Sequence, residues 1–192
     1  PENPDYTNAW LAEQDFLKNG QINWIDLYQA NINNKNSGLL STYALYDDKA
    51  ENRTFWLNSM MSYKISNSLN LTASLAYKNS NSEYYAEMDD LLGGEGYLDV
   101  YNFSDDISEA QNDLRNPKRI VKNDDKFKYN YEVFASVFDG FTQVQYLRRK
   151  FEAYAALQFD LTSYQRNGLY ENGRYPGEKS YGKSEVLDFM NY

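Results

Sequence analysis

The stretch FEAYAALQFDLTSYQ, residues 151–165, decides the fold class of this chain. Its apolar residues occupy odd positions, and polar residues such as Glu152, Gln158 and Asp160 lie between them. A period of two residues is typical of a β-strand with one apolar and one polar face. The stretch therefore predicts a strand whose apolar face contacts either a protein core or the hydrocarbon of a membrane. Its polar face would then contact bulk water or a wet lumen, respectively.

Further segments show the same alternation. FWLNSMMSYKI (55–65) and LTASLAYK (71–78) are separated by the short turn SNS at 66–68, which predicts a hairpin. The segment 127–147 alternates as far as Val137 and is joined to 151–165 by RRK at 148–150 alone. We therefore predict two antiparallel hairpins.

Asp139-Gly140 lies inside the segment 127–147, where the apolar residues move from odd positions to Val144 and Tyr146. Asp-Gly between two alternating runs is a hairpin signal. The alternative is one long strand whose phase changes at a β-bulge. We expect the bulge, because a hairpin would leave residues 141–147 too short beside the stretch 151–165.

Composition excludes several classes of function. The chain of 192 residues has no cysteine and no histidine, which excludes disulfides, thiolate or imidazole metal sites and histidine-based catalysis. The net charge of −9 argues against nucleic acid as a partner. The mean hydropathy of the chain is −0.79. The sequence also has no long apolar run that could form a membrane-spanning helix. We therefore predict that the protein is not an enzyme and binds no cofactor or metal.

The connections between the predicted strands differ greatly in length. The two hairpin turns are short, whereas the connection over about 84–126 exceeds forty residues. From residue 83 to residue 125, twelve acidic and four basic side chains give a net charge of −8. Compact soluble domains seldom contain such a loop, but outer-membrane barrels combine short turns at one end with long extracellular loops at the other. The pattern favours a membrane barrel.

The region 7–30 is the part of the chain with a helical pattern. Trp10, Leu11, Phe16 and Leu17 fit a short amphipathic helix that ends at Gly20. Asn23 is expected to cap a second helix that begins with WIDLYQA.

The acidic loop contains the candidate binding residues. Tyr97, Tyr101 and Phe103 could stack on a sugar or a peptide, or could pack the loop against itself. The run DDLLGGEGYLD lacks EF-hand spacing, so a solvated loop is expected there instead of a Ca²⁺ site.

Four segments resemble one family: INWIDLYQAN (22–31), DLLGGEGYLDV (90–100), NDLRNPKRIVKNDDKFKYNYEVFASVFDGFTQVQ (112–145) and YQRNGLYENGRYPGEKSYGKSE (164–185). They are similar, in the same order, to the middle portion of the barrel in TonB-dependent outer-membrane receptors of Bacteroidota, the SusC/RagA-like group. The resemblance covers most of the chain. A plug domain, a TonB box and a regulatory domain are not recognisable, so no ligand-binding residue of the family can be assigned here.

The resemblance implies a 22-stranded barrel in the outer membrane of a Gram-negative bacterium. Such receptors import a bulky nutrient (glycan, peptide or metal chelate) with energy from the TonB complex, and many act with a SusD-like surface lipoprotein. These partners would act through parts of the receptor outside this chain.

The fold prediction is all-β, with about six long strands of an antiparallel transmembrane barrel section and a short helical segment near the N-terminus. Because unpaired strand edges are unstable in hydrocarbon, and because the chain ends in the strand-like run VLDFMNY, we expect a section of a larger barrel. The predicted divisions are an extracellular loop with short helices (1–37), barrel strands (38–83), an acidic extracellular loop (84–126), a barrel hairpin (127–165), an extracellular loop (166–183) and the start of the next strand (184–192).

The membrane hypothesis assigns each strand residue to lipid or to the lumen. The predicted lipid-facing residues are Phe55, Leu57, Leu71, Leu75, Tyr77, Leu157, Phe159 and Leu161. The predicted lumen-facing residues are Asn58, Thr72, Lys78, Glu152, Gln158 and Asp160.

Two alternatives remain. A soluble, secreted all-β glycan- or protein-binding module would pack the same odd positions against a second sheet. A small complete outer-membrane barrel, either a porin or an adhesin, would place them in lipid as well.

Overall fold

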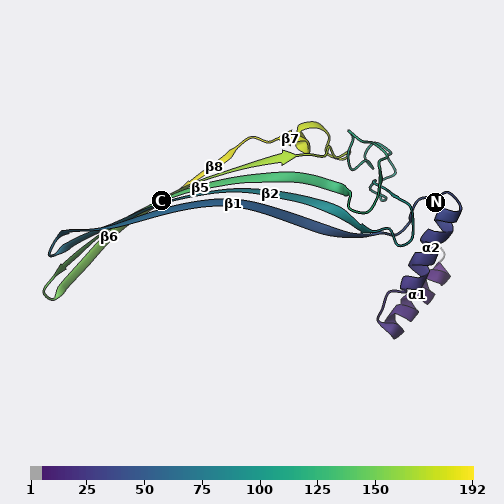
Figure 1. Ribbon diagram of the computed structural model, residues 1–192, viewed down its shortest axis with the longest axis horizontal. Helices are drawn as coiled ribbons and strands as arrows, with labels where there is room; N and C mark the ends of the chain where they lie inside the picture. Colours follow the sequence, from purple (N-terminus) through teal and green to yellow (C-terminus); the bar gives the residue numbers. More distant parts are fainter. Residues whose placement is uncertain (1–5) are drawn as a thin grey trace.

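The computed structural model describes residues 6–192 and is mostly β, with an open antiparallel sheet of long strands and two N-terminal helices (Figure 1). Residues 1–5, the first part of the predicted loop 1–37, lie outside the described residues. The elements are α1 (Tyr6–Asn19), α2 (Trp24–Asn36), β1 (Leu45–Ser66), β2 (Leu69–Asp90), β3 (Tyr97–Leu98), β4 (Ile120–Val121), β5 (Lys126–Arg148), β6 (Phe151–Gly168), the 3₁₀ turn η1 (Gly177–Lys179), β7 (Gly182–Lys183) and β8 (Leu187–Asn191).

The two helices confirm the predicted helical region and extend it to Asn36. Helix α1 ends at Asn19, and the next residue, Gly20, has a φ of +63° and donates its backbone N–H to the Phe16 carbonyl at 2.6 Å. Asn23 caps α2, because its side chain accepts from the Asp26 N–H at 3.4 Å. No helix in the described part of the chain is long and apolar enough to cross a membrane.

The main sheet has the strand order β1-β2-β5-β6, and both β7 and β8 pair with β6. Four strands are long; β7 has two residues and β8 has five, so the prediction of about six long strands was too high. The predicted hairpins are confirmed, with turns at 67–68 and 149–150. Both turns lie at the same end of the sheet, since Leu69 is paired with Tyr146. The long connections and the helices lie at the opposite end (Figure 1).

Several predicted boundaries were wrong at the loop end of the sheet. Residues 38–44 form no strand, β2 continues to Asp90 and β6 continues to Gly168. The acidic loop is therefore 91–125. Strand pairing persists past the charged residues because Glu83 and Glu87 form ion pairs with Lys126 and Lys49 on the neighbouring strands.

The predicted bulge at Asp139-Gly140 is wrong, since β5 runs through this dipeptide with an unbroken register to β2 and β6. A register shift lies instead near the start of β5. There Ala86 pairs with Phe127 while Tyr85 pairs with Asn130, so Lys128 and Tyr129 are extra residues. Lys128 has a φ of +62°, a left-handed conformation typical of a bulge.

The apolar residues of β5 lie on one face of the sheet near the loops and on the opposite face near the turns. The reason is that the surroundings of each face differ along the strand. Near the loops, Phe127 packs with Ala86 and Met88 beneath the loop 91–125. Farther along, Phe138 and Val144 are exposed on the other face. One strand thus carries two apolar sets without a change of phase.

The buried core lies under the loops, and the long sheet is a single layer. The core cluster consists of Ala86, Met88, Leu91, Val121 and Phe127. The accessible surface is 14351 Å², whereas a compact monomer of 22.5 kDa exposes about 9,500 Å². Over most of its length the sheet therefore has no protein layer on either face.

Candidate functional site

The first candidate site is a continuous apolar face on the turn half of the sheet. The register places cross-strand neighbours side by side: Leu57 pairs with Tyr77, Tyr77 with Phe138, and Phe138 with Leu161. We call this surface the apolar face; its residues are Phe55, Leu57, Met61, Tyr63, Leu71, Ala73, Leu75, Tyr77, Phe138, Gly140, Thr142, Val144, Tyr146, Phe151, Ala155, Leu157, Phe159 and Leu161.

All eight residues predicted to face lipid lie on the apolar face. Most are well exposed; Leu157 is 76% exposed and Leu57 is 59% exposed, whereas Leu71 is half-buried. No second layer covers them among residues 6–192, so the packing expected of a soluble sandwich is not found there.

The apolar face has a defined length along the strands. On β5 it extends from Tyr146 to Phe138, a rise of eight residue steps or about 26 Å at about 3.3 Å per residue. Beyond it, the register aligns Asn79, Ser136 and Ser163. The chemistry of the face therefore changes from apolar to polar at one level on β2, β5 and β6, whereas on β1 the partner of Asn79 at that level is Phe55.

The opposite side of the sheet, which we call the mixed face, carries all six residues predicted to face a lumen. Its members include Asn58, Met60, Thr72, Lys78, Asp139, Phe141, Gln143, Glu152, Gln158 and Asp160. Gln158 Nε2 donates to Asp139 Oδ2 at 3.1 Å, and Gln145 Nε2 donates to Glu152 Oε1 at 2.6 Å. Exposed apolar residues such as Met60 also lie on it, so it is polar only in part.

The second candidate site is the loop assembly at the other end of the sheet. The loop 91–125 covers the mixed face, because its residues Leu91 and Val121 pack on Ala86, Met88 and Phe127. Strands β3 and β4 pair within this loop. The acidic loop is therefore a folded unit that shares its core with β2 and β5.

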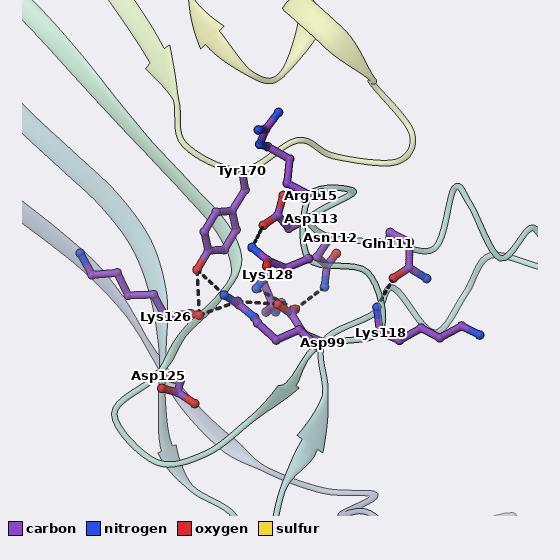
Figure 2. A network of polar contacts seen from close by, with 12 residues as sticks. Asp99, Gln111, Asn112, Asp113, Arg115, Lys118, Asp125, Lys126, Lys128 and Tyr170 are labelled. Atoms are coloured by element: carbon purple, nitrogen blue, oxygen red, sulfur yellow. Dashed lines mark hydrogen bonds and ion pairs between the residues drawn. The ribbon is translucent and has the colours of Figure 1, made fainter.

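A buried polar network joins the loop 91–125 to β5 and to the connection 169–186 (Figure 2). The Asp99 carboxylate accepts from Arg119 Nη2 at 2.7 Å and from Asn112 Nδ2 at 2.8 Å. Arg119 also donates to the Tyr170 hydroxyl at 3.0 Å and to the Lys126 carbonyl at 2.6 Å. The loop, the start of β5 and the connection 169–186 thus meet at one guanidinium.

Burial and hydrogen bonding act in opposite directions on the pKa values of this network. Burial lowers the pKa of Arg119, but the hydrogen bonds to Tyr170 and Asp99 outweigh burial and raise it overall. Burial raises the pKa of Tyr170, although Arg119 acts in the opposite direction. The network therefore holds a charged guanidinium and a neutral phenol at neutral pH.

A second set of contacts fastens the two loops to each other. The Leu114 N–H donates to the Glu171 carbonyl at 2.7 Å, and the Gly173 N–H donates to the Gln111 carbonyl at 2.8 Å. The Glu171 N–H in turn donates to Asp113 Oδ1 at 3.2 Å. The loop 91–125 and the connection 169–186 are therefore joined by backbone and side-chain hydrogen bonds.

The three predicted ligand-binding aromatics have different surroundings. Tyr97 packs against the core, with its ring centroid 6.1 Å from that of Phe127. Tyr101 and Phe103 contact each other at 5.7 Å, and Phe103 is 89% exposed. Of the three, Phe103 is thus the most accessible for stacking, since the Arg174 guanidinium lies 5.6 Å from the centroid of the Tyr101 ring. Asp99, Arg119 and Tyr170 were missed, because their spacing in the sequence carries no recognisable signal.

No family model, curated protein or solved structure matches this chain. The resemblance to TonB-dependent receptors therefore stays a prediction, and function is argued from the geometry.

Proposed function

We propose that this chain forms part of the wall and mouth of an outer-membrane transport barrel of the TonB-dependent type. The observation that carries the proposal is the uncovered apolar face on a single-layered sheet. Its length of about 26 Å along the strands is about 20 Å in height for strands tilted by about 40°, which approaches the apolar band of about 25 Å around outer-membrane barrels. In this arrangement the apolar face contacts lipid and the mixed face lines a wet lumen.

Aromatic residues at both ends of the apolar face support this orientation. Tyr63, Tyr146 and Phe151 lie toward the turns, and Phe55 and Tyr77 lie toward the loops. Girdles of aromatic residues flank the apolar band of membrane barrels, because their rings favour the interface between hydrocarbon and water.

The position of the loops supports the proposal that they form the extracellular mouth of the barrel. The loop 91–125 folds over the mixed face, so it would project over the lumen and not over the lipid. A fastened, acidic loop assembly there would restrict which solutes enter. The exposed Tyr101 and Phe103 are the residues proposed to contact a bulky nutrient.

The free sheet edges support incorporation into a larger barrel. In the described residues, the outer edge of β1 pairs with no strand. Unsatisfied backbone groups in hydrocarbon cost several kcal/mol each, so further strands are required to close the sheet.

A cysteine scan tests the proposal, because the chain has no native cysteine. Single cysteines at positions 151–162 would carry a nitroxide, and collision with oxygen and with a water-soluble nickel complex would be measured in vesicles. We expect oxygen to dominate at odd positions and nickel at even positions, with Lys122→Cys in the loop as a water-exposed control. Nickel access at every position would contradict a lipid-facing wall.

A second test addresses transport. Bacterial cells that lack the protein would be compared with complemented cells for growth on glycans, peptides and metal chelates. We expect a growth defect on one nutrient class, with the same defect when the TonB complex is removed. Normal uptake of all three classes would contradict the transport role.

A further inference from the structure

The turn between β5 and β6 is unusually basic. Arg148, Arg149 and Lys150 are consecutive and exposed. Arg148 pairs with Phe151 and lies on the apolar face, immediately beyond Tyr146. The corresponding turn of the other hairpin, at 66–68, is Ser-Asn-Ser and carries no charge. A positive cluster therefore marks the turn end of the apolar face at one hairpin.

The protein does not neutralise this cluster. Within residues 6–192, none of the ion pairs involves Arg148, Arg149 or Lys150. The adjacent acid, Glu152, lies on the mixed face and accepts from Gln145. The three cations are therefore free to bind an external anion at the end of the apolar face.

A depression in the apolar face lies farther along the same hairpin. Its volume is about 410 Å³, and its apolar-face lining consists of Ala73, Leu75, Gly140, Thr142, Leu157 and Phe159. Thr142 is six residues from Arg148, about 20 Å along the strand and about 15 Å in depth for strands tilted by about 40°. That depth is half of a hydrocarbon core of about 30 Å, which is how far the acyl chain of one leaflet reaches.

We propose that the β5–β6 hairpin binds an anionic phospholipid of the leaflet at the turn end. Arg148, Arg149 and Lys150 hold its phosphate, and one acyl chain occupies the depression beside Gly140. Arginine binds phosphate with two parallel hydrogen bonds, and a cation near a membrane surface strengthens the binding of anionic lipid about fivefold. This inference rests on the proposed function, because it requires the apolar face to contact lipid.

The test measures which lipid occupies the depression. Thr142→Cys would carry a fluorophore, and the complete barrel proposed to contain this chain would be inserted into phosphatidylcholine vesicles that contain a small fraction of lipid brominated near the chain ends. We expect brominated phosphatidylglycerol to quench more strongly than brominated phosphatidylcholine, and the difference to shrink as salt is raised. Equal quenching by the two lipids would overturn the inference.

Two variants that each remove three positive charges distinguish lipid binding at the turn from a general effect of the protein's charge. In the labelled Thr142→Cys protein, R148Q/R149Q/K150Q should reduce the preference for phosphatidylglycerol about fivefold for each cation removed. Adding K118Q/K122Q/K179Q, which removes three exposed cations at the loop end, should leave the preference unchanged. Loss of the preference in both variants, or in neither, would contradict a site at the turn.

The same experiment distinguishes failure of this inference from failure of the proposed function. Quenching of the turn variant by brominated phosphatidylcholine, equal to that of the parent, verifies that the variant is inserted. Absence of quenching by either lipid in the parent would contradict the lipid-facing wall itself.

Discussion

The ring of Phe159 on β6 lies directly over the backbone of Gly140 on β5. The two residues are cross-strand partners, and a Cβ at Gly140 would come within 2.4 Å of the Phe159 ring carbons Cε1 and Cζ. The glycine thus allows an aromatic ring to cover the middle of the apolar face. The Asp-Gly dipeptide serves this close approach and not a turn.

Gly140→Ala should therefore displace Phe159. We expect a loss of about 1–3 kcal/mol in the free energy of unfolding in vesicles, because overpacking shifts the ring or the strands. Denaturant titration measures the loss. Phe159→Leu in the alanine background should recover part of it, and a double-mutant cycle with no coupling between the two positions would refute the contact.

Asn31 is a buried residue that fastens α2 to the segment 42–43 and to Leu91. It is fully buried, and its Nδ2 donates to the carbonyls of Tyr43 at 2.7 Å and Leu91 at 2.8 Å. Its Oδ1 accepts from the N–H groups of Thr42 at 2.9 Å and Tyr43 at 3.2 Å.

Asn31→Asp removes both donors and places a carboxylate against two carbonyl oxygens. We expect at least about 3 kcal/mol of local destabilisation, equivalent to about 100-fold faster amide hydrogen exchange in α2. Asn33→Asp is the matched control. Its exposed side chain accepts from Gln29 Nε2 at 2.9 Å, which a carboxylate can do equally well. Equal exchange in the two variants would mean that Asn31 does not hold the helix.

Arg119 neutralises the Asp99 carboxylate, whose side chain is only 1% exposed. Arg119→Met should leave that charge buried and unpaired, which typically costs about 3–5 kcal/mol. We expect proteolytic cleavage within 91–125 and faster hydrogen exchange of the Asp99 amide. Lys122→Met, which removes one exposed charge from the same loop, should have neither effect. Resistance to protease in the Arg119 variant would show that the loop does not depend on the network.

Tyr170 should give the loop assembly a dependence on alkaline pH. Burial raises its pKa above the ordinary value of about 10, so the folded state keeps the proton that the unfolded state loses. The contribution of Tyr170 to the stability of the loop assembly is complete below about pH 10. It falls as the pH rises toward the pKa of Tyr170 in the folded state.

Hydrogen exchange of the loop amides across this pH range, corrected for the intrinsic exchange rate, measures the effect. Tyr170→Phe should be less stable by about 1 kcal/mol at neutral pH but should lose the extra alkaline sensitivity. If the corrected exchange rates rise equally with pH in the parent and in Tyr170→Phe, a group other than Tyr170 causes the alkaline sensitivity.

The helices, the hairpins and the two faces of the sheet could be predicted because their signals are local. A period of two residues and a short turn act over a few positions, and Asn23 caps α2 through the N–H of Asp26, only three residues away. The bulge was placed wrongly at Asp139-Gly140 for the opposite reason. The apolar residues of β5 follow the surroundings of each face, and those depend on where the loop 91–125 folds.

The amphipathic character of the strands, and the residues that share a face on β1, β2 and β6, follow from the sequence alone, because the backbone alternates side chains whatever their surroundings. The single layer of the sheet, the cover of the acidic loop over the mixed face, and the contacts of Arg119 with Asp99 and Tyr170 depend on the tertiary structure. Those partners lie 20 and 51 residues from Arg119. Contacts over such separations depend on strand register and loop packing, which no local pattern encodes.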